Sequence, residues 1–184
     1  MTALDFFARW RVRLGYLLAV VVLLLARPTP LSILIGAFVG IIGLAMRAYG
    51  AGYLHKQEIL IIGGPYAYTR NPLYFGSSIL AAGAAIAMRS WWAALLLLVY
   101  FVLVYRFVMR REEIELRLKH GAAFDAYAAR VPLFFPRVSS STPVDATKMG
   151  FSWRQFRKNH EHQATLGFMC LLLALVVIWR LRAH

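Results

Sequence analysis

The stretch from Leu73 to Met109, LYFGSSILAAGAAIAMRSWWAALLLLVYFVLVYRFVM, contains two apolar runs that are separated by one polar break at Arg89-Ser90. A membrane-spanning helix needs about 20 predominantly apolar residues. The second run is long enough to span, whereas the first falls short unless its polar ends reach the interface, and a re-entrant segment is the alternative. The break between them predicts a tight helical hairpin.

The rest of the chain has the same apolar character. It has 184 residues, of which 60% are hydrophobic and 16% are charged, whereas soluble domains are about 45–50% apolar. This composition excludes a disordered or collagenous chain and argues against an ordinary soluble enzyme. Further apolar runs lie at Leu14–Ala26, Leu31–Tyr49 and Ala164–Trp179, of which the first and the last are also short for a span. We therefore predict one all-α, polytopic membrane domain over residues 1–184, with about five transmembrane helices.

The first apolar run follows several arginines, as the core of a signal peptide would. Arg27-Pro28 comes directly after it, where a cleavage site of small residues would be expected. We therefore expect a helix that is retained. The glycines and alanines in Leu31–Tyr49 and in the run Leu73–Met88 predict close helix packing rather than a chemical role.

Basic residues outnumber acidic ones by 21 to 8, which gives a formal net charge of +13. With five spans, most Lys and Arg and every acidic residue fall on the side of the N-terminus. Because cytoplasmic loops carry the Lys and Arg excess, we expect the N-terminus and the active site to be cytoplasmic and the C-terminus to lie opposite. Basic residues that flank apolar runs favour lipid head groups over nucleic acid as the partner. The lone cysteine, Cys170, excludes a multi-cysteine metal site.

One predicted cytoplasmic segment, His55–Gly76, has the sequence HKQEILIIGGPYAYTRNPLYFG. Its Gly-Gly-Pro triplet predicts a turn. Pro72 is suited to begin the next helix, and Arg70 stands just before it. A helix N-terminus beside an arginine suits a carboxylate or a phosphate. An interfacial aromatic belt with a helix cap is the alternative interpretation of this segment.

The other predicted cytoplasmic segment, Arg111–Pro136, has the sequence REEIELRLKHGAAFDAYAARVPLFFP. Adjacent residues on a helix point about 100° apart, so Glu112 and Glu113 are not expected to face one ligand together. We expect Glu112 to face a pocket and Glu113 to pair with Arg117. A salt-bridged, solvated helix face is the alternative. The motif His160-Glu161-His162 lacks the spacing of a zinc site, so we expect interfacial polar residues and no metal.

Together, GPYAYTRNPLYFG and the later pattern EE…L…G..F..Y..RVP…P resemble the superfamily of isoprenylcysteine carboxyl methyltransferases and phospholipid methyltransferases. The resemblance covers residues 54–136 and leaves a basic tail and the last apolar run at 137–184. It implies S-adenosylmethionine as the cofactor and a membrane-embedded acceptor, for which the carboxylate of a prenylated cysteine is the example. Alternatives are a phospholipid amine N-methyltransferase, a non-catalytic membrane scaffold and a sterol reductase. Sterol reductases share a similar C-terminal motif but are much longer, so the length of this chain argues against that class.

The resemblance also implies roles for individual residues. Arg106 and Arg130 are expected to face the acceptor, and Glu113 is the candidate base for an amine acceptor. The commonest family form has His where this chain has Asn71, so position 71 is not expected to carry a proton. The residues implied to bind the cofactor are Glu58, Ile59, Leu60, Ile61, Gly64, Tyr66, Arg70, Asn71, Pro72, Leu73, Tyr74 and Glu112.

Overall fold

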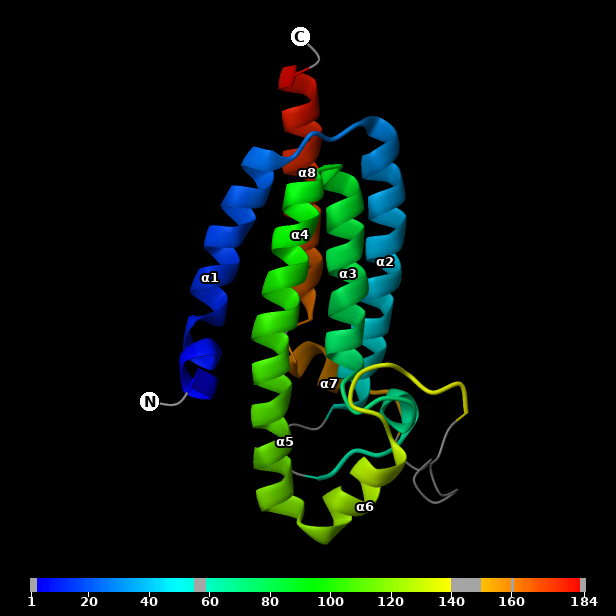
Figure 1. Ribbon diagram of the computed structural model, residues 1–184. Helices are drawn as coiled ribbons and strands as arrows, with labels where there is room; N and C mark the ends of the chain where they lie inside the picture. Colours follow the sequence, from blue (N-terminus) through cyan, green and yellow to red (C-terminus); the bar gives the residue numbers. More distant parts are fainter. Residues whose placement is uncertain (1–2, 55–58, 140–149, 160, 183–184) are drawn as a thin grey trace.

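The computed structural model describes residues 3–54, 59–139, 150–159 and 161–182, and the side chains from Arg13 onward. Within these ranges the chain forms helices, turns and loops without a strand, which confirms the predicted all-α class (Figure 1). The elements are α1 (Ala3–Leu25), α2 (Pro30–Tyr53), the short helix η1 (Gly64–Ala67), α3 (Pro72–Met88), α4 (Trp91–Tyr100), the π-helical turn η2 (Phe101–Tyr105), α5 (Arg106–His120), α6 (Ala122–Arg130), α7 (Trp153–Lys158) and α8 (His162–Arg182).

Three helices in the described part of the chain are long and apolar enough to cross a membrane. They are Pro30–Tyr53, Trp91–His120 and His162–Arg182, and the second of them runs without interruption through α4, η2 and α5. The apolar part of α1, Arg13–Leu25, and helix α3 are shorter. The last apolar run, Ala164–Trp179, is short by itself, and α8 reaches spanning length only with the polar and basic residues at its ends, as the sequence analysis requires.

Helix α3 packs most closely against α2, and small residues make this approach possible. A Cβ atom on Gly43 of α2 would lie 2.5 Å from the backbone nitrogen of Leu80, and one on Gly83 of α3 would lie 2.6 Å from the carbonyl oxygen of Gly36. Such distances leave no room for a side chain. This confirms the prediction that the glycines serve close helix packing.

The break between α3 and α4 is the predicted tight turn. Arg89 ends α3 in the left-handed region with φ of 49°, and the Ser90 side chain caps α4 by accepting a hydrogen bond from the Ala93 backbone. The backbone N–H of Arg27 donates to the carbonyl of Met88 at 2.8 Å, so the α1–α2 connection is fastened to the same turn.

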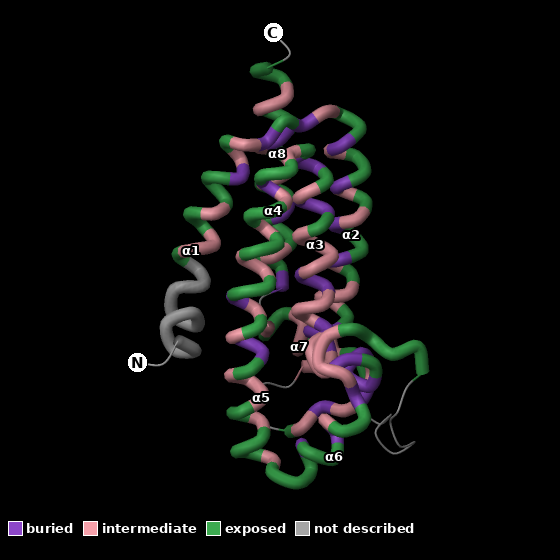
Figure 2. Tube along the Cα trace, in the orientation of Figure 1, coloured by how far each residue is buried: buried purple, intermediate pink, exposed green. Residues whose placement is uncertain are grey.

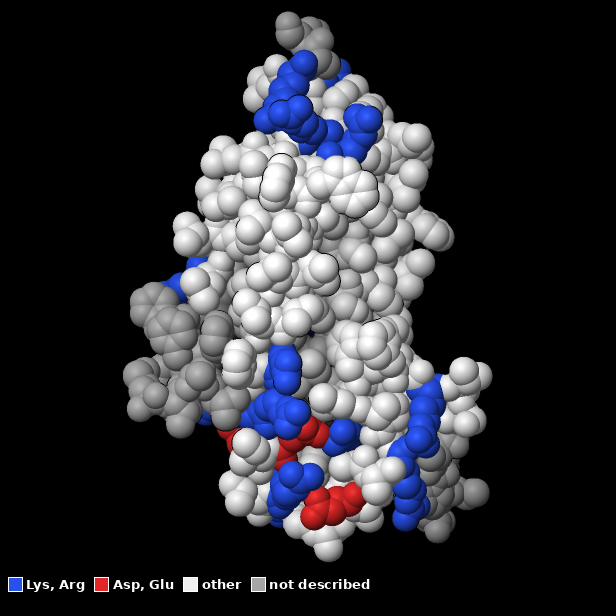
Figure 3. Space-filling view, viewed as in Figure 1, with Lys and Arg blue, Asp and Glu red and all other residues white. Residues whose placement is uncertain are grey.

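Charge and burial divide the molecule along its length. Buried residues lie mainly where the helices face one another (Figure 2). Many large apolar side chains are exposed on the outside. On the face shown in Figure 3, basic side chains gather at both ends, acidic ones lie only at the lower end, and the wide band between is nearly free of charge. The lower end, which we call the polar end, contains α5, α6, η1 and the loop at 131–137 (Figure 1).

Candidate active site

The two segments that the sequence singles out are joined by hydrogen bonds at the polar end. The backbone N–H of Arg70 donates to the carbonyl of Pro132 at 2.9 Å, and the Asn71 side-chain amide donates to the carbonyl of Leu133 at 3.0 Å. The Thr69 hydroxyl donates to the carbonyl of Phe134 at 2.9 Å. The loop before α3 is therefore held by the loop after α6, which fixes the direction of the Arg70 side chain.

Tyr66 of η1 is buried against α6. The hydroxyl of Tyr127 donates to the carbonyl of Tyr66 at 2.8 Å, and Tyr127 packs in an apolar cluster with Phe124 and Val131. Burial, followed by the nearby Tyr127 and Glu112, raises the pKa of Tyr66 far above its usual value of 10.0. Burial also raises the pKa of Tyr127, against a smaller opposing effect of Arg70. Both hydroxyls therefore stay protonated at neutral pH, and that of Tyr127 acts as a neutral hydrogen-bond donor.

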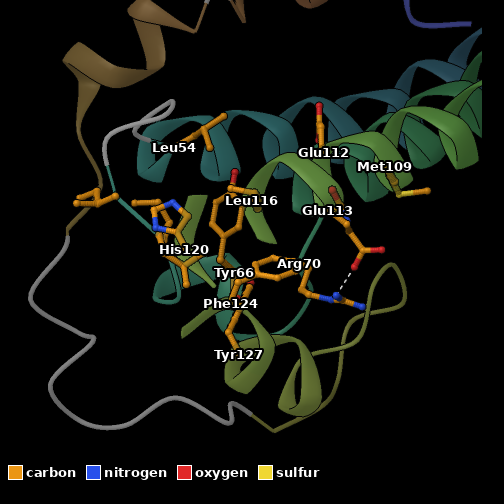
Figure 4. Close-up of a pocket in the computed structure, with 14 residues that line it drawn as sticks. Leu54, Tyr66, Arg70, Met109, Glu112, Glu113, Leu116, His120, Phe124 and Tyr127 are labelled. Carbon is orange, nitrogen blue, oxygen red and sulfur yellow. Dashed lines mark hydrogen bonds and ion pairs between the residues drawn. The ribbon is translucent and has the colours of Figure 1, made fainter. Parts of the chain in front are cut away.

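A small cavity of about 90 Å³ lies between α5, α6 and the segment 59–71 (Figure 4). Three of its lining residues have buried polar atoms without a hydrogen-bond partner in the described structure: Tyr66 Oη, Arg70 Nε and His120 Nε2. A buried polar group that lacks a partner costs about 1–3 kcal/mol, so a cluster of three is unusual in a folded protein. The cluster therefore offers three polar groups to a ligand or to water inside this cavity.

Glu112 and Glu113 both line the small cavity, but they point in different directions (Figure 4). The hydroxyl of Tyr74 donates to Glu112 at 2.5 Å, and Glu113 forms an ion pair with Arg70. The expected pairing of Glu113 with Arg117 is wrong, because Arg117 pairs with Asp125 at 2.7 Å. The loop before α3 places Arg70 next to α5, so Glu113 pairs with a residue that is distant in the sequence.

A large cavity of about 780 Å³ adjoins the small one and shares Tyr66, Arg70 and Glu112 with it. Ligand pockets typically measure about 300–1,000 Å³, so this space is large enough for a cofactor together with part of an acceptor. Residues of α1, α2, α3, α4, η2, α5 and α8 line it. The cavity therefore reaches from the polar end into the helical bundle.

Aromatic rings form one wall of the large cavity. The rings of Tyr74 and Tyr105 meet edge to face with centroids 5.1 Å apart, and the Tyr105 ring stacks on Phe101 at 4.4 Å. Tyr105 ends the π-helical turn η2, and such turns are frequent at functional sites. Faces of tyrosine rings attract cations, so this wall suits a positively charged group.

A third cavity, of about 200 Å³, extends the large one among α1, α3, α4 and α8. It shares Gly15, Ala19, Tyr100 and Tyr105 with the large cavity, and its other lining residues are almost all apolar. The third cavity therefore adds mainly apolar space beside the large one.

The structure brings most of the predicted site residues to these cavities. Glu58 lies outside the described residues. Arg106 and Arg130 are exposed and line none of the three cavities. Ile59, Leu60, Ile61 and Glu113 line the small cavity, Pro72, Leu73 and Tyr74 line the large one, and Tyr66, Arg70, Asn71 and Glu112 line both.

Gly64 also lines none of the cavities. Its φ of +58° lies in the left-handed region, and a Cβ atom there would lie 2.5 Å from the ring of Tyr53. The glycine is needed for the turn and for the approach of Tyr53, and it has no direct contact with the cavity space.

The sequence analysis missed several lining residues. His120 ends α5 and carries one of the unpartnered nitrogens. Arg47, Asn159 and Glu161 line the large cavity, although Arg47 lies within an apolar run and Glu161 was expected to be an interfacial polar residue. The position of Arg47 was the available signal, because a charge inside an apolar span usually has a functional role.

Comparison with known proteins identifies the family. A family model described as phospholipid methyltransferase matches residues 14–122, which is more than half of the chain. The chain belongs to the phospholipid methyltransferase family. This confirms the superfamily resemblance that the motifs at 54–136 indicate.

Two curated bacterial relatives match the chain over part of their length. The nickel-cobalt-cadmium resistance protein NccN of Alcaligenes xylosoxydans xylosoxydans is 36% identical over 107 residues, which cover 55% of this chain and 50% of the relative. The cobalt-zinc-cadmium resistance protein CzcN of Cupriavidus metallidurans is 31% identical over 106 residues, which cover 54% and 49%. The chain therefore matches about half the length of these relatives. No solved structure matches it.

Proposed function

We propose that this chain is a membrane methyltransferase that uses S-adenosylmethionine and methylates a lipid or lipid-linked acceptor. The observation that carries the proposal is the cluster of three unpartnered polar atoms in the small cavity, on Tyr66, Arg70 and His120, next to a larger cavity that reaches into the bundle. Membership of the phospholipid methyltransferase family gives the reaction class. We further propose that the polar end faces the cytoplasm, because most basic residues fall on that side of the spans.

The residues of the two cavities fit the parts of this cofactor. The apolar side chains of Ile59, Leu60 and Ile61 suit the adenine ring. Arg70 and the N-terminus of α3, which Asn71 leaves without a side-chain cap, suit the carboxylate, and Glu112 suits the ammonium group. The faces of Tyr74 and Tyr105 suit a sulfonium cation. When bound, the cofactor supplies an electrophilic methyl group on sulfur.

In this proposal the residues of the chain contribute by positioning the acceptor and the cofactor and by stabilising their charges. Methyl transfer is an in-line displacement, so holding the acceptor atom in line with the methyl group supplies much of the rate enhancement. A carboxylate acceptor requires no base, because it is already deprotonated. The carboxylate of a prenylated cysteine is the example of such an acceptor. The apolar third cavity supports a lipid acceptor, because it offers a hydrocarbon chain a place between α1, α3 and α8.

N-methylation of a phospholipid amine is the second candidate, and the family description favours it. An amine must lose a proton during transfer, and Glu113 remains the proposed base. The ion pair with Arg70 has to open before this carboxylate accepts a proton. The two candidates differ in their product: alkali releases methanol from a methyl ester, whereas an N-methyl group resists it.

The experiment that tests the proposal is calorimetric binding of S-adenosylhomocysteine to the detergent-purified protein, with NADPH as the comparison ligand. Binding of S-adenosylhomocysteine alone supports the methyltransferase. Binding of NADPH alone would assign the chain to the reductases instead. If the folded protein binds neither ligand, in detergent or in lipid nanodiscs, the non-catalytic scaffold replaces the proposal.

A further inference from the structure

Arg47 places a positive charge inside an apolar transmembrane helix. It lies six residues before Tyr53 at the end of α2, which is about 9 Å along the helix axis. Its side chain is 19% exposed. A charge at such a position is costly unless it is paired, and intramembrane ionisable residues usually have a functional role.

The guanidinium of Arg47 joins three parts of the chain. Nε and Nη2 donate to the carboxylate of Glu161 at 3.0 and 2.9 Å, and Nη1 donates to the hydroxyl of Ser77 on α3. Glu161 directly precedes α8, and its side chain is 8% exposed. The fork-to-fork geometry fixes the plane of the guanidinium.

A purely structural role is the simplest explanation for this pair, since it fastens α8 to α2 and α3. A buried ion pair, however, often adds little stability compared with apolar residues of the same size. Arg47 and Glu161 also both line the large cavity. A guanidinium carries more N–H groups than its bonds to Glu161 and Ser77 use, so donors remain for a ligand.

The position of the pair along the cavity suggests which ligand it meets. Ser77, the Arg47 partner, lies three residues after Tyr74 on α3, so the two side chains share a helix face. Tyr74 and its partner Glu112 belong to the proposed cofactor end. Arg47 therefore lies one helical turn farther into the bundle, where a group that enters from the membrane comes first.

We propose that Arg47, held by Glu161 and Ser77, is a positioning residue that binds an anionic oxygen of the lipid acceptor, either a carboxylate or a phosphate. The inference rests on the proposed function. Glu161 offsets the charge of Arg47, so the guanidinium orients the anion without holding it as tightly as an unpaired arginine would. The family match ends at residue 122, and Glu161 lies beyond it. The C-terminal segment therefore completes the acceptor end of the cavity and contributes to specificity.

The test compares the double variant Arg47→Gln/Glu161→Gln with the wild type. Removing both charges together avoids leaving one buried charge without a partner, which single variants would do. Arg154→Gln is the matched control, because it removes an exposed arginine of α7 outside the three cavities. The probes are oleate, dioleoylphosphatidylglycerol and uncharged diolein. Thermal unfolding in detergent reports probe binding, and calorimetry reports the affinity for S-adenosylhomocysteine.

We expect at least one anionic probe, and not diolein, to raise the unfolding temperature of the wild type and of Arg154→Gln. The double variant is expected to bind that probe about tenfold or more weakly, since hydrogen bonds to charged groups are lost. Its affinity for S-adenosylhomocysteine should stay within about threefold of the wild type, a change well below that of one lost hydrogen bond to a charge. The more effective anion, oleate or phosphatidylglycerol, identifies the head group.

Three results would overturn the inference: equal anion responses in the double variant and the wild type, a response to diolein as large as that to the anions, or a parallel loss of S-adenosylhomocysteine binding. The last would assign the pair to the cofactor end. If the wild type binds no S-adenosylhomocysteine but its anion response still depends on Arg47, the anion site is supported while the proposed methyltransferase function fails. A double variant that is already unfolded without a probe would show that the Arg47–Glu161 pair has a structural role, and this would also overturn the inference.

Discussion

Replacing Tyr66 by phenylalanine should change stability and ligand binding in opposite directions. The hydroxyl of Tyr66 is buried and has no hydrogen-bond partner in the described structure, although it lines the small cavity. Removing an unsatisfied buried hydroxyl relieves a cost of about 1–3 kcal/mol, less whatever water recovers. We therefore expect the ligand-free Tyr66→Phe protein to be about 1 kcal/mol more stable than the wild type.

The same substitution removes a donor to the ligand. A neutral hydrogen bond contributes about 0.5–1.5 kcal/mol, so the affinity for S-adenosylhomocysteine should fall by about two- to tenfold. Thermal unfolding in detergent measures the first effect, and about 1 kcal/mol corresponds to a rise of about 2–4 °C for a chain of this length. Calorimetry measures the second effect.

Tyr68→Phe is the matched control, because Tyr68 is two residues away, 40% exposed and outside the three cavities. It should change neither quantity by more than about 0.5 kcal/mol, as is usual for surface substitutions. A less stable Tyr66→Phe protein would mean that the hydroxyl has a partner. Unchanged affinity would mean that the small cavity does not receive the ligand, and either result would refute the reasoning.

Three further predictions concern the cofactor end, the α2–α3 contact and alkaline pH. Glu112→Gln removes the charge that accepts the hydrogen bond from Tyr74, and we expect about tenfold weaker S-adenosylhomocysteine binding by calorimetry with little change in unfolding temperature; full affinity would contradict our placement of the site. Gly43→Ala forces a methyl group against the backbone of α3 at 2.5 Å and should destabilise the protein by about 1–3 kcal/mol in thermal unfolding. Gly167→Ala, with nothing within 4 Å, should not destabilise it, and equal effects would disprove the packing argument. The folded state raises the pKa of Tyr66 and Tyr127 above the ordinary value of 10.0, so the unfolded chain loses these two protons first and folding becomes less favourable as the pH rises above about 10. The unfolding temperature should therefore fall above about pH 10, and less steeply in Tyr66→Phe than in Tyr68→Phe; identical slopes would show that burial of Tyr66 does not control the loss.

The sequence alone predicted the helical membrane class, the turn at Arg89-Ser90 and the close packing of small residues. These features depend on local composition: long apolar runs need a lipid environment, and glycine or alanine on a helix face permits close approach. The sequence also identified the two segments that hydrogen-bond to each other at the polar end. It predicted this region through a family resemblance, which the family match over residues 14–122 confirms.

The sequence failed where the role of a side chain depends on a partner far along the chain. Glu113 was expected to pair with Arg117 one turn away, yet it pairs with Arg70, which the loop before α3 brings beneath α5. Arg106 and Arg130, which the family resemblance implies to face the acceptor, have exposed side chains and line none of the three cavities, and their role stays a prediction.

The ion pair between Arg47 and Glu161 in the large cavity could be found only from the tertiary structure. Arg47 and Glu161 are 114 residues apart, and neither belongs to a local motif. The sequence determined that a charge lies within an apolar span and that a carboxylate precedes the last helix. Only the packing of α8 against α2 and α3 brings the two together, because charges in a low-dielectric environment are tolerated when the fold gives them partners.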